Sequence, residues 1–138
     1  MAIEVQGLTP LIQVFNMPRS FAFYRDVLGF EVMSDSGNGD DSSWVWLRLN
    51  GCNLMLNDQY EPGNVPDAPP AERVEWHSDT CLYFGCADVE AAYDHLRSKG
   101  LEPDPPKVAP YGMKQLYVRD PDNYNICFQW RVDRNADG

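Results

Sequence analysis

The pattern of apolar and polar residues in the first part of the chain predicts a strand, a helix, a short strand and a hairpin, in that order. Residues 9–15 have a strand pattern and end at Asn16, a typical helix N-cap; the helical stretch over residues 19–28 then stops at Gly29. Two alternating apolar runs over residues 44–57 predict the hairpin. This order is a β-α-β-β-β unit.

The same order returns in the second part of the chain. Residues 81–87 have a strand pattern, Asp88 is the next N-cap, and the helical stretch over residues 89–99 stops at Gly100. A second hairpin is expected over residues 115–130. The two caps are 72 positions apart, and the hairpins align under the same offset. We interpret the chain as one unit written twice.

The two hairpin turns support this offset. Asn50-Gly51 between alternating apolar runs is the strongest short-range hairpin signal. The second turn covers residues 120–123, and Asn123 lies 72 positions after Gly51. Asparagine is the non-glycine residue that best tolerates the left-handed backbone of such turns. Both turns are therefore predicted to hold a residue with positive φ.

The repeat predicts an α+β protein with two βαβββ modules in tandem, at about residues 8–57 and 80–131, within a single domain over residues 1–138. The proline-rich residues 58–79 between them are expected to form a crossover loop without a helix or strand. We expect the strands of both modules to curl into a mixed, incomplete barrel around a cleft.

Alternation within the strands assigns side chains to the concave face of this sheet. Val45, Leu47 and Leu49 are aliphatic and are expected to face the helices, so the residues between them should face the cleft. The mixture of aromatic, amide and guanidinium groups on that side is typical of a pocket for an organic ligand, although a dimer contact could cover the same surface. The strand residues expected to line the cleft are Gln13, Trp44, Trp46, Arg48, Met55, Cys81, Tyr83, Gln115, Tyr117, Cys127 and Gln129.

Charge and cysteine content narrow the classes of partner. Eleven lysines and arginines stand against 21 aspartates and glutamates, a formal net charge of -10, which disfavours nucleic acid and anionic membrane surfaces. The four cysteines form no C-x-x-C pair, no secretory leader opens the chain, and no apolar run approaches the length of a membrane span. We expect reduced thiols, a cytoplasmic protein, no membrane contact and a small organic molecule as the partner.

Two segments carry a family resemblance. Residues 16–30, reading Asn-Met-Pro-Arg-Ser-Phe-Ala-Phe-Tyr-Arg-Asp-Val-Leu-Gly-Phe, and residues 120–124, reading Asp-Pro-Asp-Asn-Tyr, closely resemble the vicinal oxygen chelate superfamily. It includes glyoxalase I, bleomycin resistance proteins, fosfomycin resistance enzymes and extradiol dioxygenases, and the resemblance covers about residues 8–131. It implies the fold described above, a homodimer, and a cavity bordered by the loop over residues 107–114, which makes Tyr111 and Met113 candidate ligand contacts at a gate.

The resemblance also implies four metal-ligand positions, usually occupied by His and Glu, two in each module. In this chain those positions hold Thr9, Met55, Cys81 and Cys127. Because none is His or Glu, we expect that the metal has been lost and that no cofactor binds. Cys81 and Cys127 could instead form a dithiol or a soft-metal site, but two small residues filling vacated space is the favoured interpretation.

Three functions remain open at this point. The first is a metal-free protein, similar to bleomycin resistance proteins, that binds an aromatic or cationic small molecule. The second is a metal-dependent lyase, isomerase or dioxygenase with a divalent metal displaced toward Glu75, His77 or Asp79. The third is a metal-free enzyme in which His77, Tyr83 or Tyr117 transfers a proton.

Overall fold

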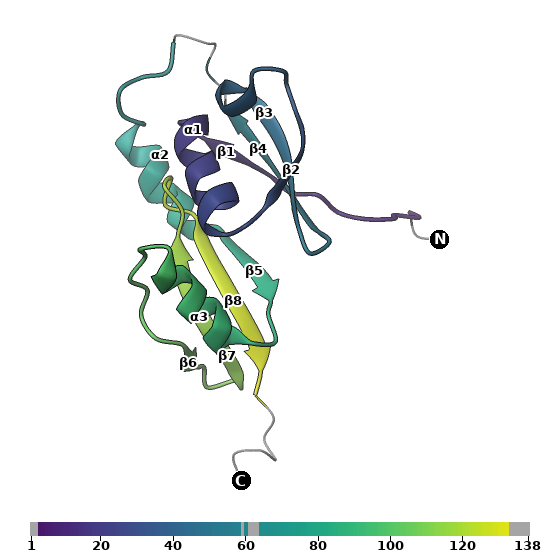
Figure 1. Cartoon of the computed structure of the whole chain (residues 1–138), viewed down its shortest axis with the longest axis vertical. Coiled ribbons are helices and arrows are strands. Elements are labelled where there is room, and N and C mark those ends of the chain that lie inside the picture. Colours follow the sequence, from purple (N-terminus) through teal and green to yellow (C-terminus); the bar gives the residue numbers. More distant parts are fainter. Residues whose placement is uncertain (1–2, 59, 61–63, 133–138) are drawn as a thin grey trace. The chain divides into compact units, whose positions relative to one another are not determined.

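The structure is a computed structural model that describes residues 3–58, 60 and 64–132 (Figure 1). The chain divides into two compact units, Met1–Pro69 and Pro70–Gly138, here called the N-terminal and the C-terminal unit. Each unit contains one four-stranded mixed sheet. The predicted α+β class and the two tandem βαβββ modules are confirmed.

In the N-terminal unit the strand order is β1-β4-β3-β2. The first strand pairs in parallel with the last, and the other neighbours are antiparallel. The elements are β1 (Leu11–Val14), α1 (Met17–Phe21), the π-helix η1 (Ala22–Val27), β2 (Glu31–Asp35), the 3-10 helix η2 (Gly39–Asp41), β3 (Trp44–Leu49) and β4 (Cys52–Asp58).

The C-terminal unit repeats this topology with the order β5-β8-β7-β6. Again the first strand is parallel to the last. The elements are α2 (Ala71–Trp76), the 3-10 helix η3 (His77–Asp79), β5 (Cys81–Gly85), α3 (Val89–Ser98), β6 (Lys107–Val108), β7 (Met113–Arg119) and β8 (Asn125–Arg131).

The predicted helix caps and stops are confirmed, whereas α1 begins at Met17, two residues earlier than predicted. The side chain of Asn16 accepts a hydrogen bond from the Arg19 N–H at 3.0 Å, which caps α1, and Asp88 caps α3 through the Ala91 N–H at 3.0 Å. Gly29 and Gly100 have φ values of 96° and 92°, so each ends its helical segment in a left-handed conformation. The first helical segment differs from the expected single α-helix, because it becomes a π-helix at Ala22.

Both turns also have the predicted backbone. Asn50 and Gly51 have φ values of 49° and 87°, as a two-residue hairpin turn requires, and Asn123 has a φ of 74°. The Asn123 side chain also donates to the Val74 carbonyl oxygen at 2.7 Å, which ties the second turn to α2.

One predicted loop contains regular structure, and that prediction was wrong. Residues 58–79 include α2, which begins after Pro70, where proline suits a helix start. At six residues this helix is too short to show a helical period. The short strand that the repeat predicts between the second helix and the second hairpin is β6, which has only two residues and pairs with β7 at its outer edge. The first strand is also shorter than predicted, because β1 begins at Leu11 rather than at Thr9.

Burial follows the predicted alternation. In the N-terminal unit Val45 and Leu47 are buried, whereas Trp44, Trp46 and Arg48 are half-buried. In the C-terminal unit α3 contacts β7 and β8 and lies along them in Figure 1. The buried hydrophobic residues of the two sheets and of α3 include Ile12, Val14, Val45, Leu47, Leu54, Leu56, Val89, Leu96, Leu116, Val118 and Ile126.

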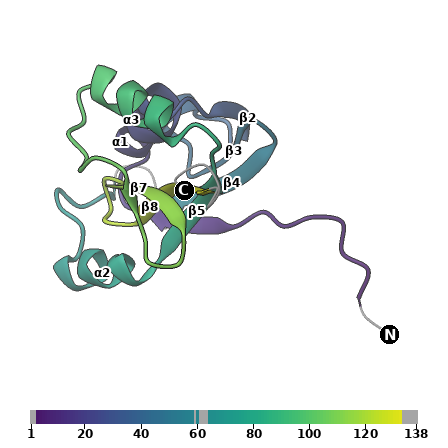
Figure 2. The ribbon, with the colours of Figure 1, turned by 90° about the horizontal axis from the view of Figure 1, so that it is seen from below.

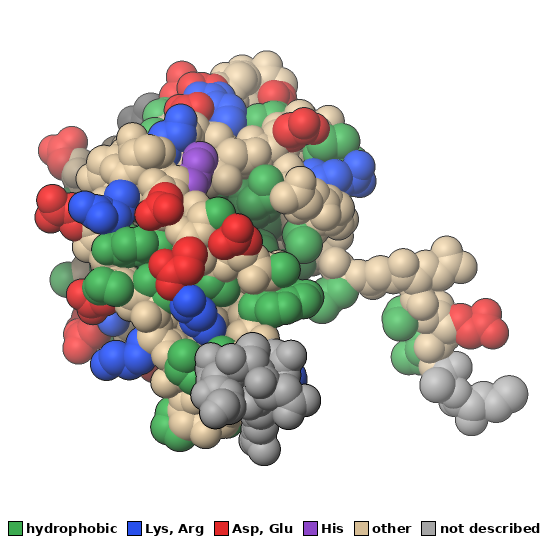
Figure 3. Space-filling view, turned by 60° about the horizontal axis from the view of Figure 1, so that its bottom comes forward, with side chains coloured by type: hydrophobic (Ala, Val, Ile, Leu, Met, Phe, Trp, Pro, Cys, Tyr) green, Lys and Arg blue, Asp and Glu red, His purple; other side chains and the backbone are tan. Residues whose placement is uncertain are grey.

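Residues 3–10, the N-terminal arm, leave β1 without helix or strand and stand out from the N-terminal unit (Figure 2). Ile3, Val5 and Leu8 on this arm are exposed. In Figure 3 the arm projects as an extended segment, and acidic side chains are spread over the visible face. Among the described residues, no helix is long and apolar enough to cross a membrane.

Candidate functional site

The sheet of the N-terminal unit carries the predicted tryptophans side by side with residues of its neighbouring strands. Trp46 on β3 lies opposite Met55 on β4, which lies beside Leu11 on β1. One step further along, Trp44 lies opposite Asn57, which lies beside Gln13. We call Trp44, Trp46, Arg48, Asn53 and Met55 the indole face. The register therefore brings the N-terminal ligand candidates onto one face of one sheet.

Asn53 organises this indole face, although no sequence pattern singled it out as a candidate. Its Oδ1 accepts hydrogen bonds from Trp46 Nε1 at 2.8 Å and from Arg48 Nε at 3.1 Å. The Arg48 guanidinium lies 5.1 Å from the centroid of the Trp46 ring, within cation–π range. The shared acceptor and the stacking fix both side chains. The remaining Arg48 N–H groups can meet an acceptor on a ligand.

The sheet of the C-terminal unit carries a second set of candidates. Tyr83, Cys127 and Tyr117 form one cross-strand row over β5, β8 and β7. Gln129 and Gln115 face each other in the next row. We call these five residues, together with Cys81 in the row before, the tyrosine face.

The tyrosine face has a hydrogen-bond network at its centre. Gln115 is only 9% exposed, and its Nε2 donates to Gln129 Oε1 at 2.9 Å and to the Tyr111 hydroxyl at 2.8 Å. Tyr83 and Tyr117 are 54% and 44% exposed, their hydroxyl oxygens are 3.4 Å apart, and their rings meet edge to face. The polar centre is therefore fixed, while two aromatic rings remain open to a ligand.

A hollow of about 480 Å³ lies beside this network, within the C-terminal unit. It is formed between β7 and the loop that contains β6, and we call it the loop hollow. Its lining residues are Asp104, Pro105, Lys107, Val108, Ala109, Pro110, Tyr111, Gln115 and Tyr117. Tyr111 is one of these lining residues, and its role as a ligand contact at a gate stays a prediction. Met113 is half-buried and pairs with Arg131 at the start of β7, outside the lining of the loop hollow.

Tyr117, Cys81 and Cys127 of the tyrosine face are held in their neutral forms. The hydrogen bond with Tyr83, followed by burial, raises the pKa of Tyr117 well above its ordinary value. Burial raises the pKa values of Cys81 and Cys127. At neutral pH these groups are a phenol and two thiols, which suits hydrogen bonding and packing better than proton abstraction or thiolate chemistry.

His77 has partners for both ring nitrogens. Its Nδ1 lies 2.9 Å from the Asp122 carbonyl oxygen, its Nε2 lies 3.2 Å from the Tyr124 hydroxyl, and its ring stacks on Tyr124 with centroids 4.1 Å apart. This arrangement fastens η3 to the turn between β7 and β8. The catalytic roles suggested for His77, Tyr83 and Tyr117 stay predictions.

The positions that hold metal in related proteins offer a poor donor set here. Thr9 is exposed ahead of β1, Met55 contributes only a thioether, and the thiols of Cys81 and Cys127 favour the protonated form. The described part of the chain contains no group of three or more His, Cys, Asp or Glu side chains placed to hold a metal ion, and this includes the neighbourhood of Glu75 and Asp79. The residues present do not fit the family's metal.

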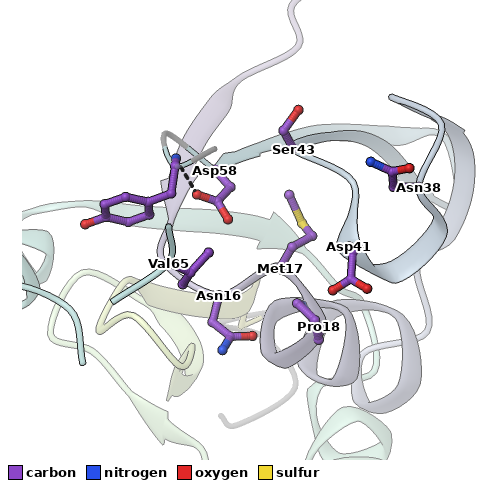
Figure 4. A pocket seen from close by; sticks show the side chains of 9 residues that line it. Asn16, Met17, Pro18, Asn38, Asp41, Ser43, Asp58 and Val65 are labelled. Carbon is purple, nitrogen blue, oxygen red and sulfur yellow. Dashed lines mark hydrogen bonds between the residues drawn. The ribbon is translucent and has the colours of Figure 1, made fainter. Parts of the chain in front are cut away.

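A second hollow, of about 470 Å³, lies within the N-terminal unit at the ends of β1 and β4 (Figure 4). We call it the strand-end hollow. No sequence pattern pointed to it, because its wall joins three separated segments. Its lining residues are Asn16, Met17, Pro18, Asn38, Asp41, Ser43, Asp58, Tyr60 and Val65. The Asp58 carboxylate accepts a hydrogen bond from the Tyr60 N–H at 2.7 Å. Burial raises the pKa of Asp58.

Comparison with known proteins places this architecture. TioX from Micromonospora sp. ML1 superimposes with a TM-score of 0.70 at 17% identity, over 93% of this chain and 100% of that one. TnmS3, an antibiotic binding protein from Streptomyces sp. CB03234, superimposes with a TM-score of 0.66 at 23% identity, over 96% of this chain and 99% of that one. Both likenesses concern the fold.

Sequence comparison adds the family. The uncharacterized protein YaeR of Escherichia coli (strain K12) is 32% identical over 108 residues, which cover 75% of this chain and 78% of that protein. Residues 8–128 match the sequence profile described as "Glyoxalase/Bleomycin resistance protein/Dioxygenase superfamily". The match spans both βαβββ modules, and the chain therefore belongs to the glyoxalase/bleomycin resistance protein/dioxygenase superfamily.

Proposed function

We propose that this protein binds a small aromatic organic molecule, without a metal, on the tyrosine face and in the loop hollow. The observation that carries the proposal is the Gln115 network beside two half-exposed tyrosines. A nearly buried amide with fixed partners supplies orientation, and open aromatic rings supply contact area.

The size of the loop hollow supports a ligand of this class. Its volume of about 480 Å³ falls in the range of small-molecule sites. An aromatic ring stacked on Tyr83 or Tyr117 would gain roughly 0.5–1.5 kcal/mol beyond the burial of its area. Because the Gln115 amide is already held by Gln129 and Tyr111, little ordering is needed when a ligand binds.

The indole face of the N-terminal unit is proposed as a second contact surface for the same class of ligand. Trp46 and Arg48 are half-buried and share the Asn53 acceptor, so their geometry is fixed before binding. Indole offers a large flat surface, and the guanidinium offers donors to a polar substituent of the ligand.

One of the structurally similar proteins gives this proposal a precedent. TnmS3 is described as an antibiotic binding protein, and the superfamily name includes bleomycin resistance proteins. Since TnmS3 is 23% identical, it supports the class of function and leaves the compound open. The homodimer and the cytoplasmic location expected from the sequence also stay predictions.

A ligand screen with matched variants tests the proposal. Planar aromatic antibiotics, bleomycin among them, are screened by thermal shift, and hits are titrated by calorimetry. Tyr117→Ala and Gln115→Leu should weaken a hit on the tyrosine face about tenfold or more, a loss of about 1.4 kcal/mol each. Trp46→Ala should abolish or sharply weaken a hit on the indole face. The matched controls are Tyr93→Ala on α3, which covers the other face of the sheet, and Trp76→Ala on exposed α2.

Two outcomes would contradict the proposal. One is a set of hits whose affinities are unchanged in Tyr117→Ala, Gln115→Leu and Trp46→Ala. The other is stoichiometric nickel, zinc, iron or manganese in the purified protein together with loss of ligand binding in chelator. The second result would favour the metal-dependent lyase, isomerase or dioxygenase instead.

A further inference from the structure

We propose that the strand-end hollow is a separate binding site for a small organic ammonium compound. It shares no residue with the indole face, the tyrosine face or the loop hollow. The inference therefore does not depend on the function proposed above.

The hollow is built by chain segments that are distant in sequence. Asn16, Met17 and Pro18 come from the start of α1, Asn38, Asp41 and Ser43 from around η2, and Asp58, Tyr60 and Val65 from the end of β4 and beyond. Figure 4 shows Met17, Asp41, Asp58 and Val65 around one opening. At about 470 Å³, it is as large as the loop hollow.

The charge of this lining is one-sided. Asp41 and Asp58 contribute two carboxylates, and the described lining residues include no lysine or arginine. Asp58 is half-buried, and its carboxylate accepts the Tyr60 N–H, a neutral donor that leaves the negative charge uncompensated. A half-buried carboxylate in this position favours a positively charged ligand and repels an anion.

Apolar groups complete the wall and indicate an organic cation. Met17 is 1% exposed and fixed in the core, and Pro18 and Val65 add further apolar surface. A metal ion would need more ligands, since Ca²⁺ takes six to eight oxygens. No group of three or more acidic, histidine or cysteine side chains with metal-binding geometry occurs in the described residues. An ammonium group on an apolar body matches both parts of the wall.

Benzylamine is a suitable probe, with benzyl alcohol as its neutral counterpart. Methionine methyl groups of the intact chain are labelled with carbon-13 and followed by NMR during each titration. Benzylamine should shift the Met17 signal saturably, and benzyl alcohol should not. Met33 and Met113 serve as internal controls, because neither lines the strand-end hollow or belongs to the indole face or the tyrosine face.

Variants assign the effect to the carboxylates. Asp58→Asn keeps an oxygen for the Tyr60 N–H and should weaken benzylamine about tenfold, and Asp41→Asn should act in the same direction. Asp94→Asn, an exposed carboxylate on α3, is the matched control and should change nothing. Tyr117→Ala should also leave the Met17 shift intact, which separates this site from the tyrosine face.

The pH profile gives an independent readout. Benzylamine stays protonated throughout the acidic and neutral range, so its affinity should fall as the pH drops through the raised pKa of Asp58. Asp41 and Tyr60 are the other ionisable groups of the described lining. The proposal is overturned if Met17 shows no saturable shift, if benzyl alcohol binds equally well, or if Asp58→Asn and Asp41→Asn both bind like the parent protein.

Discussion

The two units share a backbone plan and differ in the chemistry of their exposed sheet faces. Leu11 pairs with Met55 in the first parallel ladder, and Tyr83 pairs with Cys127 in the second, both 72 positions later. The face of each sheet toward the helices carries the apolar core, and the other face carries tryptophan and arginine in one unit and tyrosine and glutamine in the other. The two units therefore share the register of their parallel strands, whereas the side chains available for binding differ between them.

The corresponding strands β3 and β7 depart from this offset. Trp44 lies opposite Asn57, and Gln115 lies opposite Gln129, so β3 and β7 correspond at an offset of 71 rather than 72. The cause is the second hairpin turn, which has one residue more than the first between corresponding pairs. Within this longer turn, Asn123 takes a left-handed conformation and donates a hydrogen bond to the Val74 carbonyl oxygen of α2.

Equivalent core positions should be equally sensitive to truncation. Leu54 and Ile126 correspond by the offset of 72, and both are essentially inaccessible to solvent. Leu54→Ala and Ile126→Ala should each lower the free energy of unfolding by about 2–5 kcal/mol, measured by urea denaturation. Val108→Ala, at an exposed position, should change it by less than about 0.5 kcal/mol. A loss below about 1 kcal/mol at only one core position would show that the two cores are not equivalent.

The two turns should differ in their dependence on asparagine. Asn123→Ala loses an easy left-handed conformation and the bond to the Val74 carbonyl, so we expect a loss of about 2–3 kcal/mol. Asn50→Ala should cost about 1 kcal/mol, because only the backbone preference is lost. Unfolding in urea measures both. Glycine at each position separates the causes: Asn50→Gly should be near neutral, and Asn123→Gly should retain the loss of the side-chain bond. Equal effects of Asn50→Ala and Asn123→Ala would contradict the anchoring role.

The helix caps give the smallest and most symmetrical effect. Asn16→Ala and Asp88→Ala each remove one bond to a backbone N–H and should each cost about 1 kcal/mol of unfolding free energy. Asn16→Ser and Asp88→Ser keep an acceptor oxygen and should recover most of that loss in the same measurement. If only Asp88→Ala lowers the free energy of unfolding, the cap at Asn16 contributes little to stability. The π-helix that follows α1 would then explain the difference between the two helices.

The sequence was sufficient for the features that repeat or alternate. The caps at Asn16 and Asp88, the left-handed turns and the two faces of β3 each depend on local chemistry, which a single chain displays directly. The same alternation predicted that Trp46 and Tyr117 lie on the sheet faces turned away from the core. In the structure Trp46 is half-buried and Tyr117 is exposed.

What could not be predicted depends on short or distant elements. Helix α2 is too short for a period to be visible in a proline-rich segment, and the repeat predicts that a strand precedes the second hairpin without giving the two-residue length of β6. Asn53 was overlooked because its role depends on its position opposite Arg48 across a hairpin. An asparagine in a strand does not by itself indicate an acceptor shared by two side-chain donors. The strand-end hollow needs Asn16, Asp41 and Asp58 to meet in space, which no local pattern encodes.

The parallel pairing within each unit has a consequence for the order of folding. Leu11 meets Met55, and Cys81 meets Asn125, so both ladders close across 44 residues of chain. Closing such a loop costs entropy before any ladder bond is gained, whereas helices and hairpins form from near neighbours. During synthesis, β1 and β5 must therefore wait, with their edges unpaired, until β4 and β8 have been made. Any slowing of translation within either interval should prolong the period in which this protein is most prone to aggregate.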